Sequence, residues 1–150
     1  MNLNIIYLDS LYYLNILFYL FHLSLSIYNK MEAFNRINIG PSDYNPNTWT
    51  KLYSVDSTMT GTLIFDFSAV NITPLEGLPE RTITISIKIL DKDDKLINYI
   101  IPAQILSPKL SFNNPQKIVL KPGDKIMVQA SALGICFYAS IASGILVNNN

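Results

Sequence analysis

The sequence predicts an all-β domain, an antiparallel β-sandwich or jelly roll of about seven strands. Three observations support this prediction. Apolar and polar side chains alternate with a period of two in several short segments, as they do in half-buried strands. Pro, Gly, Asn and Asp, which favour turns, separate those segments. No helical period appears in residues 48–148, so the main part of the chain is expected to be a run of strands and short turns.

Residues 1–30 differ from the rest and are not expected to belong to the domain. They carry 20 hydrophobic residues and two charges, Asp9 and Lys30. As a helix, Ile5 to Tyr28 would reach about 36 Å, enough for a hydrocarbon core of about 30 Å. The segment lacks Gly, Ala, Val and Glu, and an ordinary composition begins at Met31. We therefore expect a wrongly chosen upstream start codon, and a membrane anchor, an uncleaved signal and a packed helix are the alternatives.

The β-sandwich domain is expected at residues 48–148, with residues 31–47 as an extended arm in front of it. Gly40-Pro41 and Asn45-Pro46 favour turns and loops in this segment. The first strand is expected at Trp49 to Val55, where apolar side chains recur at alternate positions.

The middle of the domain contains the most regular pattern of the chain. A strand is expected at Leu63 to Val70, followed by a loop rich in Pro and Gly. From Arg81 to Leu90, four isoleucines alternate with Thr, Ser and Lys, which predicts a strand with one buried face. The polar turn 91–95 then predicts a hairpin to a strand at Leu96 to Ile101, which Pro102 is expected to end.

The last part of the domain, residues 117–147, predicts two or three strands and a tight turn. Pro122 fits the second position of a type II turn, and Gly123 fits the third position, which requires a positive φ. Lys121 and Asp124 would flank that turn. The final strand is apolar on both faces, with Tyr138, Ala142 and Leu146 on the second face, so it is expected to be a central strand or a subunit contact.

The composition argues against several classes of function. Eleven basic and eleven acidic residues cancel, and the basic residues form no cluster, so no nucleic-acid partner is expected. A single cysteine, Cys136, allows no internal disulfide, and we expect it to be a packed thiol. The only histidine, His22, lies in the leader, so the domain has no histidine base or ligand for catalysis or metal binding. We expect no enzyme activity and no cofactor.

A few other groups need a separate assessment. Asp91, Asp93 and Asp94 offer oxygen ligands for calcium, but the glycine and the distal glutamate of a calcium loop are absent, so a solvated turn is the preferred interpretation. Asp66 is expected to point to solvent rather than to form a glycosidase pair. Asn71 begins a glycosylation motif to which we assign no role. An aromatic set could line a carbohydrate-binding face, although core packing is the preferred interpretation: Trp49, Tyr53, Phe65, Phe67, Phe137 and Tyr138.

Four segments together resemble small β-sandwich virion proteins of tailed bacteriophages. They are LYSV at residues 52–55, IIPAQILSPKLSF at residues 100–112, IVLKPGDKIMVQAS at residues 118–131 and FYASIASGILV at residues 137–147. The resemblance covers about residues 49 to 147, and the Pro-rich loop after Ile72 departs from it.

The resemblance implies a non-enzymatic structural protein located in the virion, of the capsid-decoration, head-fibre or tail-associated type. Its expected partners are other virion proteins and further copies of itself, with a membrane involved only if residues 1–30 are real. The alternative is a carbohydrate- or cell-surface-binding β-sandwich, anchored to a membrane in the same case.

Overall fold

The computed structural model of the chain describes residues 34–144, and these residues form strands, turns and loops. The described part contains no apolar helix of membrane-spanning length. The predictions for residues 1–30 and for Leu146 lie outside the described residues. The strands are β1 (Phe34–Ile39), β2 (Thr50–Ser54), β3 (Thr62–Asn71), β4 (Ile83–Leu90), β5 (Leu96–Leu106), β6 (Ser111–Asn114), β7 (Ile118–Leu120), β8 (Lys125–Ala130) and β9 (Ile135–Ser143).

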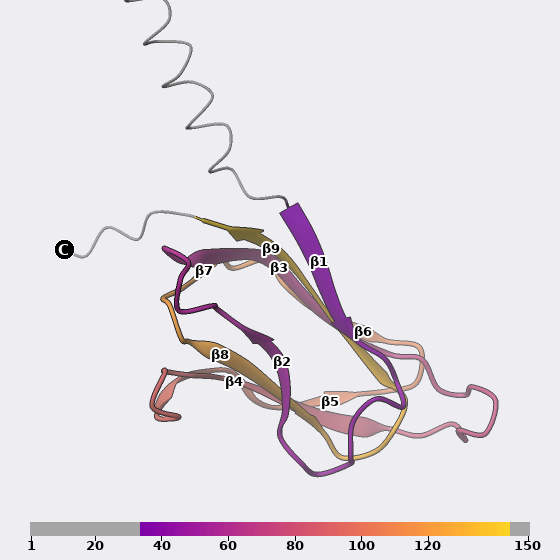
Figure 1. The fold of residues 1–150 in the computed structure, drawn as a ribbon. Helices are drawn as coiled ribbons and strands as arrows, with labels where there is room; N and C mark the ends of the chain where they lie inside the picture. Colours follow the sequence, from indigo (N-terminus) through magenta and orange to yellow (C-terminus); the bar gives the residue numbers. More distant parts are fainter. Residues whose placement is uncertain (1–33, 145–150) are drawn as a thin grey trace, which may run out of the picture. The chain divides into compact units, whose positions relative to one another are not determined.

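The chain is wrapped as one long hairpin whose innermost pair is β4 with β5. Moving outward, β3 pairs with β6 and β7, β2 pairs with β8, and β1 pairs with β9, all antiparallel. The two resulting sheets have the orders β1-β9-β3-β6, with β7 also on β3, and β2-β8-β4-β5 (Figure 1). This nested pairing is the connectivity of a jelly roll, so the structure selects that alternative among the predicted β-sandwich folds.

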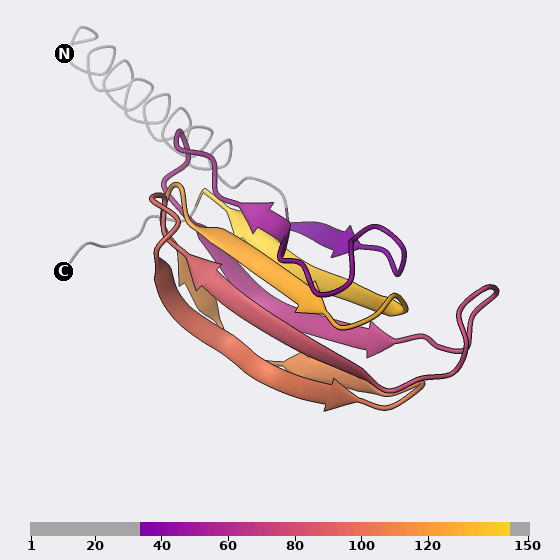
Figure 2. The ribbon, with the colours of Figure 1, turned by 90° about the horizontal axis from the view of Figure 1, so that it is seen from below.

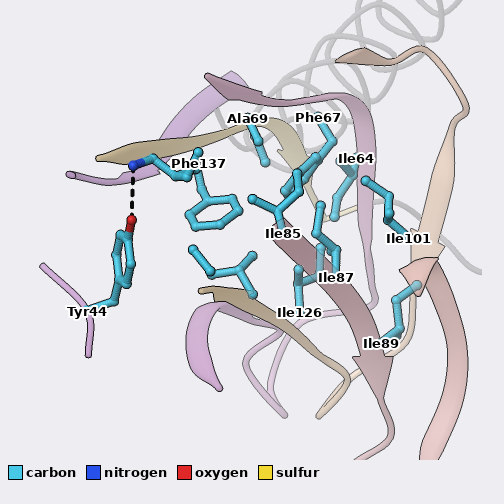
Figure 3. Packing of buried hydrophobic residues seen from close by; sticks show 14 of the residues in the cluster. Tyr44, Ile64, Phe67, Ala69, Ile85, Ile87, Ile89, Ile101, Ile126 and Phe137 are labelled. Carbon is cyan, nitrogen blue, oxygen red and sulfur yellow. Dashed lines mark hydrogen bonds between the residues drawn. The ribbon is translucent and has the colours of Figure 1, made fainter. Parts of the chain in front are cut away.

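The core lies between the two sheets and contains side chains from both. Ile83, Ile85 and Ile87 on β4 are fully buried, and Ile89 is 6% exposed, which confirms the predicted alternation. Figure 3 shows Ile85 and Ile87 packing toward Phe67 and Phe137 of the other sheet. At about 1.5 to 3 kcal/mol for each fully buried apolar side chain, this layer is the main favourable term of the fold.

The prediction that Pro102 ends a strand is wrong, because β5 continues through it to Leu106. β5 forms the edge of its sheet, where it pairs with β4 alone (Figure 2). Pro102 lies where the register of β4 and β5 shifts, and its carbonyl accepts a hydrogen bond from Ser86 Oγ at 2.8 Å. A proline at a bulge of an edge strand removes no regular ladder hydrogen bond, so the strand tolerates it.

Two further strands account for the difference from the expected seven. β6 lies in a segment that the sequence indicated as a loop. β1 lies within residues 31–47, which we expected to be an extended arm, and it pairs with β9 from Phe34↔Ala142 to Ile39↔Phe137. Tyr44, in the loop after β1, is 7% exposed. Residues 34–47 therefore pack onto the sandwich as part of it.

Candidate functional site: the outer face of the β1-β9-β3 sheet

Tyr138 and Ala142 lie on the face of β9 that points away from the core. Phe137, Ala139 and Ile141 are buried between the sheets, and alternate residues of a strand point to opposite faces. β9 lies between β1 and β3, so it is a central strand, which was one of the two predicted alternatives; the other was a subunit contact. Both Tyr138 and Ala142 are half-buried. We refer to this surface as the outer face, defined by Arg36, Leu63, Ser68, Tyr138 and Ala142.

Tyr138 is held on the outer face by polar contacts. The carbon at the centre of the Arg36 guanidinium lies 5.2 Å from the centroid of the Tyr138 ring, within the range of a cation–π contact. A hydrogen bond with the Cys136 side chain, followed by charge repulsion from that thiol, raises the pKa of Tyr138. Tyr138 is therefore neutral at pH 7 and presents a ring and a hydroxyl group to a partner. Cys136 itself is buried, in agreement with its interpretation as a packed thiol.

Pro122, Gly123 and Asp124 lie in the turn between β7 and β8. Gly123 has a φ of 87°, the value that the third position of a type II turn needs. The Asp124 carboxylate accepts a hydrogen bond from the Lys121 backbone N–H at 2.8 Å. This turn also contacts the end of β2, because Gly123 N–H donates to the Val55 carbonyl at 3.0 Å and Val55 N–H donates to the Asp124 carbonyl at 2.9 Å. The turn is thus a connection within the scaffold that links the two sheets, since β7 pairs with β3 in the sheet of Tyr138 and β8 lies in the other sheet.

Two of the three carboxylates of the β4–β5 turn are engaged in local contacts. Asp91 Oδ1 accepts from the backbone N–H groups of Asp93 and Lys95, at 2.8 and 2.9 Å. Asp94 forms an ion pair with Lys125 Nζ at 2.6 Å. Within residues 34–144, no three His, Cys, Asp or Glu side chains lie together as metal ligands. The side chains of this turn therefore brace the hairpin and tie it to β8.

The aromatic set does not converge on a single face. Phe67 and Phe137 are buried in the core. The Tyr53 hydroxyl group lies 3.0 Å from Thr62 Oγ1, and Tyr138 is on the outer face of the opposite sheet. Lys88 Nζ lies 4.1 Å from the centroid of the Trp49 ring and covers one side of it. These five rings therefore do not form one aligned row for a sugar chain.

Two polar side chains for which the sequence indicated no structural role hold the loops together. Asn71 is fully buried. Its amide nitrogen donates to the carbonyls of Arg81 and Leu106, both at 2.9 Å, and its Oδ1 accepts from Thr73 N–H and Oγ1. All the hydrogen-bonding groups of this side chain are therefore satisfied. The glycosylation motif that begins at Asn71 is inaccessible in the folded domain.

Tyr44 is the second such residue. Its hydroxyl group donates to the Ala132 carbonyl at 3.0 Å and accepts from the Ile135 N–H at 2.9 Å (Figure 3). Its ring packs edge-on against Phe137, with the centroids 6.0 Å apart. Burial raises the pKa of Tyr44. The sequence held one weak signal of this burial. Tyr44 is an aromatic residue in a segment of Pro, Asn and Asp, and a large aromatic ring tends to be buried.

Comparisons with known proteins give likenesses of fold only. No protein-family model and no curated protein matches the sequence. Among solved structures, the chain is similar to one from the T13 viral particle of IBDV, with a TM-score of 0.42, 12% identity and coverage of 77% of this chain and 32% of that one.

Two other solved structures are similar in part. One is from the infectious bursal disease virus Gx strain, with a TM-score of 0.40, 16% identity and coverage of 80% and 35% of the two chains. The other is a CocE/NonD family hydrolase from Staphylococcus aureus, with a TM-score of 0.29, 8% identity and coverage of 77% and 36%. The chain spans about a third of the length of these structures. Its function is therefore argued from its own residues.

Proposed function

We propose that this protein is a non-enzymatic structural component of a virion, and specifically of a tailed phage, where it acts by protein–protein contacts on the capsid or the tail. The observation that carries the proposal is that two segments whose sequences resemble the phage virion proteins pair with each other in the fold. Residues 52–55 and residues 118–131 are far apart in the sequence, yet β2 pairs with β8 and Val55 bonds to the turn at Gly123 and Asp124. The resembling residues thus form one continuous piece of scaffold.

The chemistry of the described residues supports a binding role. Residues 34–144 contain no histidine. The buried side chains of Asn71 and Thr73 bond to one another and to the backbone. A catalytic site needs a poised base or nucleophile beside a group that activates it. Among the described residues, polar groups instead complete the fold.

The outer face supplies the proposed contact with another copy of the chain. Tyr138 and Ala142 are half-buried on the same face of a central strand, with Ser140 between them, and Leu146 is expected to lie on that face. Tyr138 combines an apolar ring with a hydroxyl group and is flanked by Arg36. Tyrosine and arginine are enriched at protein interfaces because they bury large areas and still form polar bonds.

Mass spectrometry of purified phage particles tests the virion role. We expect peptides of residues 34–144 to copurify with the particles, and antibody labelling in electron micrographs would then distinguish capsid from tail. Absence of the protein from purified virions would refute the proposal.

Substitution tests the outer-face contact separately. Ala142→Lys and Leu146→Lys are expected to reduce incorporation into particles and self-association, because each would bury an ammonium group. Thr82→Lys, at an exposed position before β4, is the matched control. Unchanged incorporation and an unchanged oligomeric state in both variants would exclude a contact there.

A further inference from the structure

The loop between β3 and β4 projects beyond the ends of the strands (Figure 1 and Figure 2). Leu75 N–H donates to the Leu78 carbonyl at 3.0 Å, and Leu78 N–H donates to the Leu75 carbonyl at 2.7 Å, so the loop ends in a tight turn. Residues paired in this way share one face, and Leu75 is 46% exposed. We refer to residues 74–80 as the tip. The tip presents a small apolar knob.

Buried polar side chains fix the base of this loop. Asn71 Nδ2 donates to the Arg81 carbonyl at 2.9 Å, and Thr73 Oγ1 accepts from the Arg81 N–H at 3.3 Å. The side chains of Asn71 and Thr73 are fully buried, so they hold the two ends of the loop together. Pro74 and Pro79 restrict the backbone within the tip. A loop that is ordered before it binds loses little conformational entropy on binding.

The tip is acidic as well as apolar. Residues 74–80 contain two leucines, two glutamates and no lysine or arginine. Glu76 and Glu80 are exposed and form no ion pair within residues 34–144. With Arg81 at the base counted, the loop still has two negative charges against one positive charge. A matching surface therefore needs apolar groups and cations without carboxylates beside them.

A surface of this kind lies on the β2-β8-β4-β5 sheet. Side chains that are partners in the register form one row across its four strands: Lys51, Met127, Lys88 and Tyr99. We refer to these four residues as the lysine row. The row lies on the face away from the core, because Val128 and Ile87, which adjoin Met127 and Lys88 along their strands, are buried. Cationic and apolar side chains therefore alternate across this face.

The lysine row has a net positive charge. The four strands of its sheet contain three lysines and no Asp or Glu. Lys125 is neutralised by its ion pair with Asp94. Lys51 and Lys88 form no ion pair within residues 34–144, and Lys88 lies over the Trp49 ring instead. Two cations are thus available to an acidic partner.

Other described surfaces match the tip less well. On the outer face, Arg36 and Asp66 have opposite charges and lie in one row, on either side of Ser140. The turn 91–95 carries three carboxylates beside two lysines, and β5 contains no charged residue. The lysine row, in contrast, is complementary to the tip in charge and offers apolar side chains as well.

The tip and the lysine row lie toward opposite ends of the sandwich. The loop leads into Ile83, the first residue of β4, whereas Lys88 is the sixth of the eight residues of that strand. The loop also points away from the strands (Figure 2). The tip is therefore directed away from the lysine row of its own copy. A copy can offer its tip to one neighbour and its row to another.

We propose that the tip of one copy docks on the lysine row of the next, in a head-to-tail contact between copies of this chain. The leucines of the tip pack against Met127 and Tyr99, and its glutamates face Lys51 and Lys88. Contacts of this type form a ring where the rotation between copies closes and a filament where it does not. No residue of the outer face takes part, so this contact can fail while the proposed function holds.

Sedimentation velocity over a concentration series measures the self-association. The parent is the full chain with Ala142→Lys, which removes the contact proposed at the outer face, and we expect it to form species larger than a dimer. Leu75→Lys and Met127→Lys should each weaken association about tenfold, because each places an ammonium group in an apolar contact. Leu110→Lys is the matched control, because Leu110 is 57% exposed in another loop. A parent that is monomeric throughout the series would overturn the proposal.

Mixing the two variants tests the head-to-tail arrangement. Leu75→Lys keeps an intact lysine row and Met127→Lys keeps an intact tip, so a mixture contains one working contact. We expect a dimer with one copy of each variant that grows no further, at concentrations where each variant alone is monomeric. Such a dimer would also show that both variants are folded. A mixture that stays monomeric, while both variants unfold as cooperatively as the parent, would overturn the head-to-tail contact.

The charges have their own test. Glu76→Lys with Glu80→Lys should weaken association about two- to fivefold for each exposed ion pair lost, and adding Lys51→Glu with Lys88→Glu in the same chain should restore it. A fourfold variant that associates no more tightly than the tip variant would overturn the charge pairing. Loss of the tip variants from virions, in a chain that does not self-associate, would assign the tip to another virion protein and overturn the contact between copies.

Discussion

Removing one hydroxyl group, with Tyr44→Phe, tests whether residues 34–47 are part of the domain. The group joins the loop after β1 to residues 132–135, through bonds of 3.0 Å to the Ala132 carbonyl and 2.9 Å from the Ile135 N–H. Phenylalanine keeps the ring beside Phe137 but leaves the buried Ile135 N–H without its acceptor. An orphaned buried group costs about 1–3 kcal/mol, and the lost bond to Ala132 adds about 0.5–1.5 kcal/mol. We expect the free energy of unfolding to fall by about 1.5–4.5 kcal/mol.

Urea unfolding followed by fluorescence measures this loss. The slope of the free energy of unfolding against urea concentration should stay constant, since the variant exposes no additional surface on unfolding. Tyr99→Phe is the control, because Tyr99 is 42% exposed on β5, and it should change the free energy by less than about 0.5 kcal/mol. A Tyr44→Phe variant as stable as this control would refute the view that the loop is locked onto the sandwich.

Three further predictions concern the scaffold. Asn71→Ala should cost about 2–4 kcal/mol of unfolding free energy, because it leaves buried carbonyls and an N–H without partners, whereas exposed Asn113→Ala should be nearly neutral. Gly123→Ala should cost more than Gly77→Ala in thermal unfolding, because both glycines have positive φ but only at Gly123 would an added Cβ meet another side chain, 2.7 Å from Lys92 Cβ. Alkali should destabilise the protein, because the pKa of Tyr44 is raised in the fold. Tyr44 loses its proton at a lower pH in the unfolded chain than in the folded one. Its contribution to the free energy of unfolding is therefore fully present below about pH 10 and is lost as the pH rises above it. Tyr44→Phe should show a shallower alkaline loss than the unsubstituted chain, and equal slopes would contradict this assignment.

The regular strands were predictable because their signal is local. Ile83, Ile85 and Ile87 alternate with polar residues, and a strand that buries one face must carry that pattern whatever its neighbours are. The turn at Pro122 and Gly123 was predictable for the same reason, since its residue types fix their own backbone angles. All of this information lies within ten residues of the element concerned.

The parts that the sequence did not reveal depend on distant residues. β1 has only Ile37 and Ile39 as inward apolar side chains, packed against the core, and its polar residues gave the segment the appearance of an arm. The burial of Tyr44 depends on residues 132–135, and that of Asn71 depends on carbonyls at Arg81 and Leu106. No local pattern contains such partners. The candidate contact at Tyr138 and Ala142 was indicated by the apolar second face of β9, and its role remains a prediction.

The contact proposed at the outer face and the bonds that stabilise the fold use different residues. The outer face around Tyr138 belongs to the β1-β9-β3-β6 sheet, whereas the Tyr44 hydroxyl group bonds to residues 132–135. Ala142→Lys should consequently reduce self-association, and Tyr44→Phe should lower the free energy of unfolding. The double variant should show both losses, nearly additively, because the two sites share no residue.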